Sequence, residues 1–283
     1  TDETIRDFRI GAIGSEWRTL SQYLKQKGYK DADIVRAGLA KESDKGMYDR
    51  FRSRIIFPIA DSSGRIVAFT GRLLHDDPEA PKYLNSPDTP IFDKSRIFYG
   101  IDRAKSAIRM NKRAVFVEGQ FDLILSHQAG VTEAVAVSGT ALTDEIETEG
   151  KIITHLGIIK RLADTIIIAF DADKAGIKAT GRAARIGLGL GMNVTVIRIP
   201  SGKDPADYIR SEGKDAWKSL LKQATHIIIF YLNLIMEKIT DIRLRAKKVE
   251  EILVPYLAVI ESAIERSSFI HIIEQKTGIP EQA

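Results

Sequence analysis

The sequence contains no cysteine among its 283 residues. This absence excludes disulfide bonds, cysteine nucleophiles and thiolate zinc sites within the chain. The five histidines are scattered along the sequence, so we expect no histidine zinc cluster either. We therefore predict no zinc in this chain and no chemistry that needs a soft metal.

Long apolar runs are also missing. No stretch approaches 18 consecutive apolar residues, so we expect no membrane span and no membrane partner. The first eight residues, TDETIRDF, lack the basic start and apolar stretch of a secretory signal. With 44% hydrophobic residues the chain can still bury a sizeable core, and we expect a globular cytoplasmic protein.

A strong excess of one charge is absent as well, because 42 Lys and Arg face 38 Asp and Glu, for a net charge of +4. The sequence pI of about 9.1 is compatible with a polyanionic partner but does not decide the matter. The distribution of charge is more informative. Basic residues gather in the first third of the chain, at Arg50, Arg52, Arg54, Arg65, Arg72, Lys82, Lys94 and Arg96.

Changes in sequence pattern divide the chain into three regions. Residues 1–111 have short mixed segments separated by turns, including a predicted hairpin around 61–64, and indicate an α+β subdomain. Residues 112–210 alternate apolar runs with helical segments, as a parallel, Rossmann-like sheet with crossover helices requires. Residues 211–283 have helical spacing and predict a helical bundle. The fold class is therefore α/β with α+β.

Four short runs rich in β-branched residues predict strands buried on both faces of the central sheet, at 114–117, 134–137, 165–170 and 194–199. A helix is expected over 174–190, ending at Gly191. Further helices are expected over 227–239 and 249–260.

Acidic residues follow three of these predicted strands. Glu118-Gly119 follows the first, Asp171-Ala-Asp173 the third, and Asp204-Pro-Ala-Asp207 lies beyond the fourth. Carboxyl ends of parallel strands meet at one edge of a sheet, so the carboxylates are expected to converge. Oxygen ligands of this kind select Mg²⁺ or Mn²⁺, which serve phosphoryl transfer. Taken alone, an Asp-x-Asp after a strand is equally compatible with a solvated turn.

The acidic pattern resembles the Toprim domain shared by DnaG-type primases, topoisomerases and some nucleases. Its flanking residues are similar to the bacterial primase version in the stretches 118–122, 137–141, 170–176 and 202–209. Stretches before it, at 50–58, 70–72, 81–87 and 91–94, resemble the region that precedes Toprim in those primases. The chain is thus identified as a member of the DnaG-type primase family, as an isolated catalytic core.

The resemblance implies a DNA-dependent RNA polymerase that makes short RNA primers on single-stranded DNA from NTPs. It implies two or more Mg²⁺ or Mn²⁺ ions and a catalytic set of Glu118, Asp171 and Asp173. Asp204 is a further metal ligand expected. Asp122, one helical turn after Glu118, could bind a second ion or orient a ligand, or could be only a first-turn acid that the helix dipole favours. The family has Asp-Pro-Asp where this chain has Asp204-Pro-Ala-Asp207, and we favour Asp204 over Asp207. Segment 147–160 is longer than usual and has no assigned role.

The resemblance also implies contacts with nucleotide or template in the first region. The residues concerned are Arg54, Arg72, Lys82, Tyr83, Asn85 and Lys94. Arg52 is left out because such a side chain often only pairs with a neighbouring acid, and Trp17 and Trp217 are interpreted as packing residues. A replicative helicase is the implied protein partner, through a carboxy-terminal domain outside this chain, and the core is expected to be monomeric.

Two other functions remain open from the sequence. The same ions could serve a Toprim phosphodiester hydrolase or strand-cutting enzyme. Alternatively, the chain could be a non-catalytic module that binds single strands or a helicase and keeps the carboxylates as relics.

Overall fold

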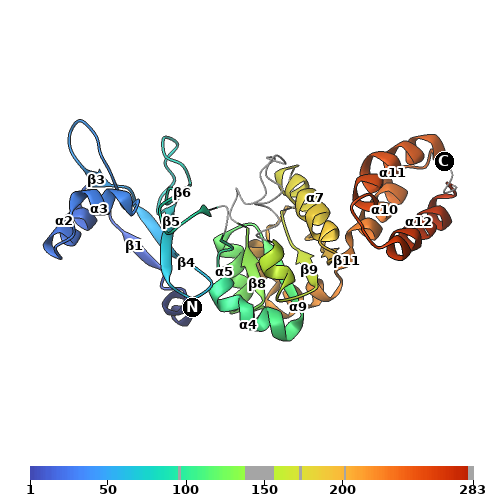
Figure 1. The fold of residues 1–283 in the computed structure, drawn as a ribbon, viewed down its shortest axis with the longest axis horizontal. Coiled ribbons are helices and arrows are strands. Elements are labelled where there is room, and N and C mark those ends of the chain that lie inside the picture. Colours follow the sequence, from blue (N-terminus) through green and yellow to red (C-terminus); the bar gives the residue numbers. More distant parts are fainter. Residues whose placement is uncertain (95–96, 138–155, 172–173, 201, 280–283) are drawn as a thin grey trace. The chain divides into compact units, whose positions relative to one another are not determined.

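The computed structural model describes residues 1–94, 97–137, 156–171, 174–200 and 202–279. The chain divides into two units, residues 1–103 and 104–283, each with its own core (Figure 1). The predicted first region reached residue 111, and helix α8 (Pro205–Glu212) continues past the predicted boundary at 210. The division into three functional regions therefore stays a prediction.

The first unit is built on an antiparallel sheet of four strands. Their order is β1 (Gly11–Ile13), β4 (Arg54–Ala60), β5 (Ile66–Leu73) and β6 (Tyr83–Asn85). A second hairpin pairs β2 (Ala40–Lys41) with β3 (Tyr48–Asp49). The helices of this unit are α1 (Asp2–Asp7), α2 (Thr19–Gln26) and α3 (Asp31–Arg36).

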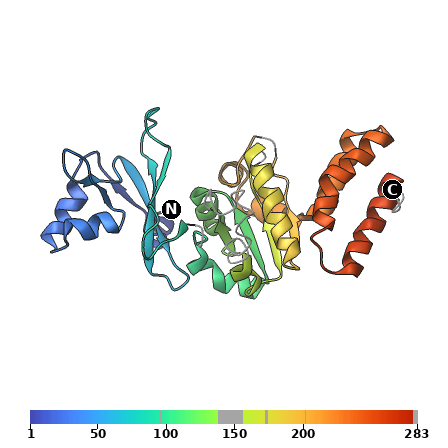
Figure 2. The same ribbon diagram turned by 45° about the horizontal axis from the view of Figure 1, so that its top comes forward.

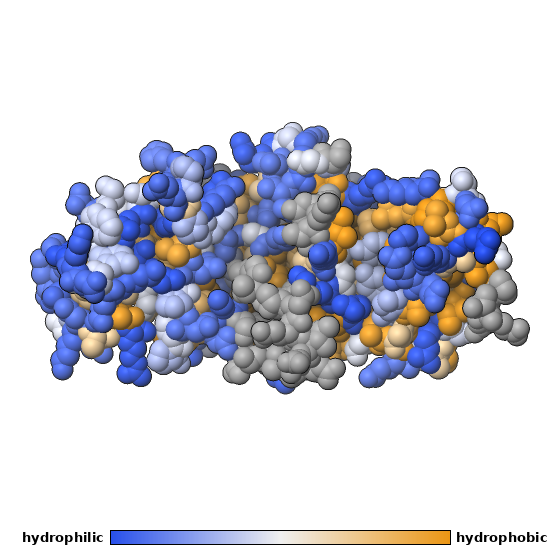
Figure 3. Space-filling model, turned by 90° about the horizontal axis from the view of Figure 1, so that it is seen from above, coloured by the Kyte–Doolittle hydropathy of each residue, from blue (hydrophilic) through white to orange (hydrophobic). Residues whose placement is uncertain are grey.

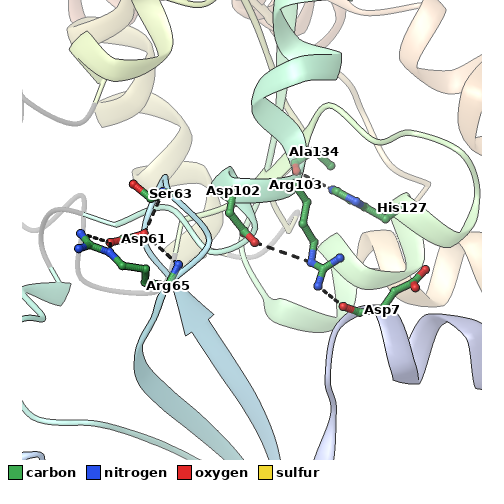
Figure 4. A network of polar contacts seen from close by, with 8 residues as sticks. All are labelled: Asp7, Asp61, Ser63, Arg65, Asp102, Arg103, His127 and Ala134. Atoms are coloured by element: carbon green, nitrogen blue, oxygen red, sulfur yellow. Dashed lines mark hydrogen bonds and ion pairs between the residues drawn. The ribbon is translucent and has the colours of Figure 1, made fainter.

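The β4–β5 turn confirms the predicted hairpin. The Asp61 carboxylate accepts hydrogen bonds from the backbone N–H groups of Ser63 at 2.9 Å and Arg65 at 3.1 Å (Figure 4). Gly64 has φ +85°, a left-handed conformation that glycine adopts without strain. The short polar stretch in the sequence is thus a turn whose backbone is held by its own first side chain.

Arg103 closes the first unit by holding α1 against its last residues. Its guanidinium donates to the backbone carbonyl of Asp7 and lies 4.0 Å from the Asp102 carboxylate (Figure 4). It also sits 4.8 Å from the ring centre of Phe8. The side chain therefore connects the two ends of the unit.

The second unit contains the predicted parallel sheet. Its strand order is β11 (Thr225–His226), β10 (Asn193–Val196), β9 (Thr165–Ile168), β7 (Arg113–Val117) and β8 (Ala134–Ala136). All neighbours are parallel except β11, which runs antiparallel to β10. Ala114, Val115 and Val117 are fully buried, as expected of a central strand covered on both faces.

Helices connect the strands and cover the sheet (Figure 2). They are α4 (Ile101–Asn111), α5 (Gln120–Gln128), α7 (Lys174–Gly189), α8 and α9 (Lys214–Lys222). The ring of His127 in α5 makes a 2.9 Å hydrogen bond with the carbonyl of Ala134 at the start of β8 (Figure 4). Trp217 in α9 is completely buried, which confirms its predicted packing role.

The predicted helical character of this region is confirmed. Its helices after the sheet are α10 (Ile227–Lys238), α11 (Ile242–Leu257) and α12 (Ala263–Thr277), so α11 begins and ends earlier than the range 249–260 expected from the sequence. They lie side by side in Figure 1 and Figure 2. Apolar side chains gather over them on the face seen in Figure 3. Among the described residues, no helix combines the length and the hydropathy that crossing a membrane would require.

Candidate metal-binding active site

The first two acidic motifs meet at the carboxyl edge of the sheet. Strands β7 and β9 are parallel neighbours, with Phe116 opposite Ile168, so the residues that follow them leave the sheet together. The backbone N–H of Asp171 donates a 2.9 Å hydrogen bond to Oε1 of Glu118. The predicted convergence of Glu118 and Asp171 is therefore present in the structure.

Gly176, in the first turn of α7, lies against this pair. A Cβ atom at this position would be 2.2 Å from the carbonyl oxygen of Asp171 and 2.6 Å from Oε1 of Glu118. Real side chains do not approach so closely, so only glycine lets α7 begin this near the two acidic residues. The close approach of the backbone thus explains why the Asp171–Gly176 motif has glycine at its last position.

Asp122 links the first and third acidic motifs. The residue is only 6% exposed, and both carboxylate oxygens accept backbone hydrogen bonds. Oδ2 accepts from the N–H of Gly119 at 2.9 Å, and Oδ1 accepts from the N–H of Ala206 at 3.0 Å. The side chain therefore holds the start of α5 against the start of α8.

The electrostatics of Asp122 show that the carboxylates lie close together. Burial, together with the negative charges of Asp204 and Asp171, raises the pKa of Asp122 to about 7, even though the two backbone hydrogen bonds act to lower it. Carboxylates that repel one another in this way are a place where a bound cation relieves the repulsion.

The two candidates in the third motif differ in position. Asp204 is half-buried and caps α8, accepting a 2.6 Å hydrogen bond from the N–H of Asp207. Asp207 is exposed and lies 3.5 Å from Arg210. Asp204 also acts on the charge of Asp122. The placement favours Asp204 as the ligand.

Several features named from the sequence lie outside the described residues: Arg96, residues 138–141 of the stretch 137–141, Asp173, and the first nine residues of segment 147–160. In the part of the chain that the structure describes, no three Asp, Glu, His or Cys side chains are arranged to hold an ion. The donors that do converge are all carboxylate oxygens, which suits Mg²⁺ or Mn²⁺ and not zinc.

Three of the predicted nucleic-acid residues, Arg72, Tyr83 and Asn85, lie on the paired strands β5 and β6. Arg72 pairs with Tyr83 across the two strands, and its guanidinium lies 5.8 Å from the centre of the Tyr83 ring. Asn85 lies two residues beyond Tyr83, so both side chains project from one face of the sheet. Lys82 and Lys94 are exposed. These residues can present cations and a ring to a nucleic acid.

Arg54 has a different environment from the other five. It is 4% exposed, and its guanidinium donates to the carbonyls of Gly71 at 3.0 Å, Pro81 at 2.9 Å and Lys82 at 3.3 Å. Such a side chain organises the loop that carries Lys82. We therefore assign Arg54 a positioning role in place of the direct contact expected from the sequence.

The structure also corrects the interpretation of Trp17 and shows that Arg52 and Tyr48 contact it. Trp17 is 59% exposed, so its predicted packing role is wrong. The guanidinium carbon of Arg52, a residue left out of the predicted set, lies 4.0 Å from the centre of the Trp17 ring, and Tyr48 meets the same ring edge-on. No pattern in the sequence indicates this contact, because Trp17 and Arg52 are brought together by the tertiary fold.

Comparison with protein families gives two matches. Residues 1–105 match the DNA primase catalytic core, N-terminal domain, and residues 115–209 match a Toprim-like family. The DNA primase of Clostridium acetobutylicum is 37% identical over 287 residues, covering 99% of this chain and 45% of that protein. The chain thus spans less than half the length of this relative.

Solved structures are similar over the whole chain. The RNA polymerase domain of Mycobacterium tuberculosis primase DnaG is 30% identical with a TM-score of 0.83, covering 97% of this chain and 87% of that one. A DnaG primase catalytic domain bound to ssDNA is also 30% identical, with a TM-score of 0.82, covering 100% of this chain and 87% of that one.

Proposed function

The chain belongs to the family of DnaG-type DNA primase catalytic cores, and from this premise we propose that it synthesises short RNA primers on single-stranded DNA. The 3′-hydroxyl of one ribonucleotide attacks the α-phosphate of the next, and pyrophosphate leaves. The observation that carries the proposal is the contact between Glu118 and Asp171, with Asp122 and Asp204 close by.

The metal-holding residues in this proposal are Glu118, Asp171, Asp173 and Asp204, directly or through water. Two or more Mg²⁺ or Mn²⁺ ions bound there would neutralise charge on the triphosphate oxygens and lower the pKa of the attacking hydroxyl. Asp122 keeps its two backbone hydrogen bonds and positions the other carboxylates. Because Gly176 has no side chain, it leaves room for Glu118 and Asp171 at the edge of the sheet.

The second part of the proposal concerns the nucleic acid. Lys82, Lys94 and Arg72 supply positive charge to phosphates, while Tyr83 and Asn85 supply a stacking surface and hydrogen bonds for a base. Arg54 acts through the loop whose carbonyls it binds. The template selects the incoming NTP by base pairing, so these residues need no sequence-specific contact.

Partners follow from the same premise. Single-stranded DNA and NTPs are the substrates, and contact with a replicative helicase, through a domain outside these residues, is part of the proposal. We also propose that the core acts as a monomer in the cytoplasm, where replication takes place in bacteria.

The test is primer synthesis on single-stranded DNA with labelled NTPs and Mg²⁺ or Mn²⁺. Wild-type chain is compared with Glu118→Gln and Asp171→Asn, which preserve side-chain shape. Short RNA products that disappear in both variants support the proposal. Cleavage of the DNA without NTPs, or DNA binding with no product at high enzyme and Mn²⁺, would favour a hydrolase or a binding module instead.

A further inference from the structure

A hollow of about 520 Å³ lies in the second unit, where α7 and α11 are in contact. We name it the α7 hollow, and the residues of its wall that matter below are Lys178, Arg182, Arg185, Tyr231, Glu251 and Tyr256. The acidic residues Glu118, Asp171 and Asp204 are not part of this wall. A space of this size can hold a ligand as large as a nucleotide, away from the candidate metal site.

The side of the hollow that α7 forms is strongly basic. Lys178, Arg182 and Arg185 are spaced four and three residues apart on this helix, so they project from one face. The helix contains no Asp or Glu that could pair with them from the same element. Like charges at this spacing destabilise a helix. A bound anion would therefore relieve their repulsion and stabilise α7.

The side that α11 forms does not neutralise this charge. Glu251 lines the hollow, but its carboxylate lies 2.5 Å from the ammonium group of Lys248, which offsets its charge. Lys178 and Arg185 are exposed, and among the residues that the structure describes neither has a carboxylate within ion-pair distance. The hollow thus keeps an excess of positive charge.

Two stacked tyrosines form another part of the wall. The rings of Tyr231 and Tyr256 lie with centres 5.6 Å apart and planes 12° from parallel. Burial raises the pKa of both hydroxyls, so each stays protonated at neutral pH and can donate a hydrogen bond to a phosphate oxygen. Gly181 in α7 leaves room for Tyr256, because a Cβ atom there would lie only 3.1 Å from the tyrosine hydroxyl.

Pro255 adds a hydrogen-bond acceptor to the same wall. This proline lies inside α11 and has no N–H, so the carbonyl of Glu251, four residues earlier, lacks its usual helical donor. Ile177, which is 52% exposed, and Ile252 contribute apolar surface. The hollow therefore combines cations, hydroxyl donors, a backbone acceptor and apolar surface, which together match the phosphates, the sugar and the base of a nucleotide.

We propose that the α7 hollow binds a free nucleoside diphosphate or triphosphate, as a second nucleotide site apart from the acidic edge of the sheet. The phosphates lie against Lys178, Arg182 and Arg185, where charge-assisted hydrogen bonds hold them. The sugar and base lie on the apolar surface and donate to the carbonyl of Glu251. A bare phosphate ion would leave that surface and that carbonyl unused. Binding here requires neither a metal ion nor primer synthesis, so the inference goes beyond the proposed function.

The test measures binding of fluorescently labelled ADP and GDP to the whole chain by anisotropy, with EDTA present and without DNA. The chelator removes the metal ions that would hold a nucleotide at the acidic edge. Unlabelled ADP, pyrophosphate, adenosine and a short oligo-dT are then used as competitors. We expect ADP to displace the probe at a lower concentration than any of the other three.

Variants of the basic face assign the site. Lys178→Gln and Arg185→Gln each remove an exposed cation, so they should melt like wild type and bind the labelled nucleotide about tenfold more weakly. Arg243→Gln is the matched control, because Arg243 is exposed on α11 but does not line the hollow. It should bind like wild type.

Asp171→Asn separates this inference from the proposed function, since the variant should lose primer synthesis and still bind the labelled nucleotide like wild type. Nucleotide binding that is lost in Asp171→Asn but kept in Arg185→Gln would place the nucleotide at the acidic edge and overturn the inference. Wild-type affinity in both Lys178→Gln and Arg185→Gln, no binding of either probe, or displacement by pyrophosphate, adenosine or oligo-dT as effective as that by ADP would also overturn it. Each of these results would leave primer synthesis by the wild-type chain untouched.

Discussion

The hydrogen bond from the N–H of Asp171 to the carboxylate of Glu118 joins residues 53 positions apart at 2.9 Å. It connects the ends of two neighbouring strands, so the position of one acidic residue depends on the other. Hydrogen bonds to a charged acceptor are among the stronger ones in proteins. Substitutions at Glu118 should therefore act both on catalysis and on the geometry of the sheet edge.

Glu118→Gln and Glu118→Ala separate these two effects. Gln keeps an oxygen that can accept from Asp171, so we expect a melting temperature close to wild type. Ala leaves the N–H without its acceptor and should lower the free energy of unfolding by about 1–2 kcal/mol. Loss of a residue that only supports a metal ligand typically costs roughly 10–100-fold in activity. Because Glu118 is proposed as a ligand itself, primer synthesis should fall by more than this in both variants. Synthesis retained in Glu118→Gln would argue against Glu118 as a ligand.

Gly176→Ala tests the close approach of α7. The new Cβ would meet the Asp171 carbonyl and the Glu118 carboxylate at distances that no side chain tolerates. We expect a loss of roughly 1–3 kcal/mol of stability and a strong loss of primer synthesis. Gly189→Ala, at the other end of the same helix, is the control, because its nearest neighbour lies at 3.8 Å. Equal activity in the two variants would show that the sheet edge adapts.

Much of this site could be predicted from the sequence because local patterns determine it. Apolar β-branched runs identify strands β7 and β9, and the position of Glu118 and Asp171 directly after them predicts a shared edge. The parallel order of the strands then makes the convergence a consequence of topology. The carboxylate ligands themselves predict Mg²⁺ or Mn²⁺ and phosphoryl transfer, and the motif resemblance added the particular reaction, RNA primer synthesis.

What could not be predicted depends on contacts between distant segments. Arg54 looks like any exposed arginine in sequence, yet the carbonyls that bind it lie 17–28 residues away. Trp17 was interpreted as a packing residue because most tryptophans are covered. Its exposure results from the way Asp49 holds the start of α2, which no local pattern reveals.

The contrast between Arg54 and Lys82 leads to a third prediction. Arg54→Met removes a buried guanidinium that donates to three carbonyls, of which that of Lys82 keeps the N–H of Leu73 as a donor, so stability should fall by about 2–3 kcal/mol. Lys82→Ala removes an exposed side chain and should leave stability unchanged. For single-stranded DNA, Lys82→Ala should weaken binding and reduce its dependence on salt by about one phosphate contact. Melting curves and salt titrations of both variants provide the check.

An unaltered salt dependence in Lys82→Ala would remove this lysine from the proposed nucleic-acid contacts. A melting temperature of Arg54→Met close to that of wild type would contradict the positioning role of the arginine. Arg65→Met is a suitable reference, because Arg65 pairs with Asp61 in an exposed turn and its loss should matter little.

His226 gives the chain a pH dependence outside the acidic site. Burial lowers the pKa of this histidine from 6.5 to about 4. Its Nδ1 accepts a 3.4 Å hydrogen bond from the N–H of Ile228 at the start of α10, and its ring stacks on Phe269 with centres 4.3 Å apart. Accepting at Nδ1 requires the neutral ring, so protonation removes the cap as well as burying a charge.

The folded state therefore binds this proton less readily than the unfolded state. The stabilisation is fully present above pH 6.5 and is lost as the pH falls from 6.5 towards 4. Because His226 is half-buried, solvent screening reduces the effect from about 3 to roughly 2 kcal/mol. His226→Asn keeps a side-chain oxygen that can cap the helix but has no titrating ring. Urea unfolding of both proteins between pH 7.5 and 4, buffered at about half-unit steps, should show the wild type losing roughly 2 kcal/mol more than the variant. Parallel curves would mean that His226 is protonated as easily in the folded protein as in the unfolded chain.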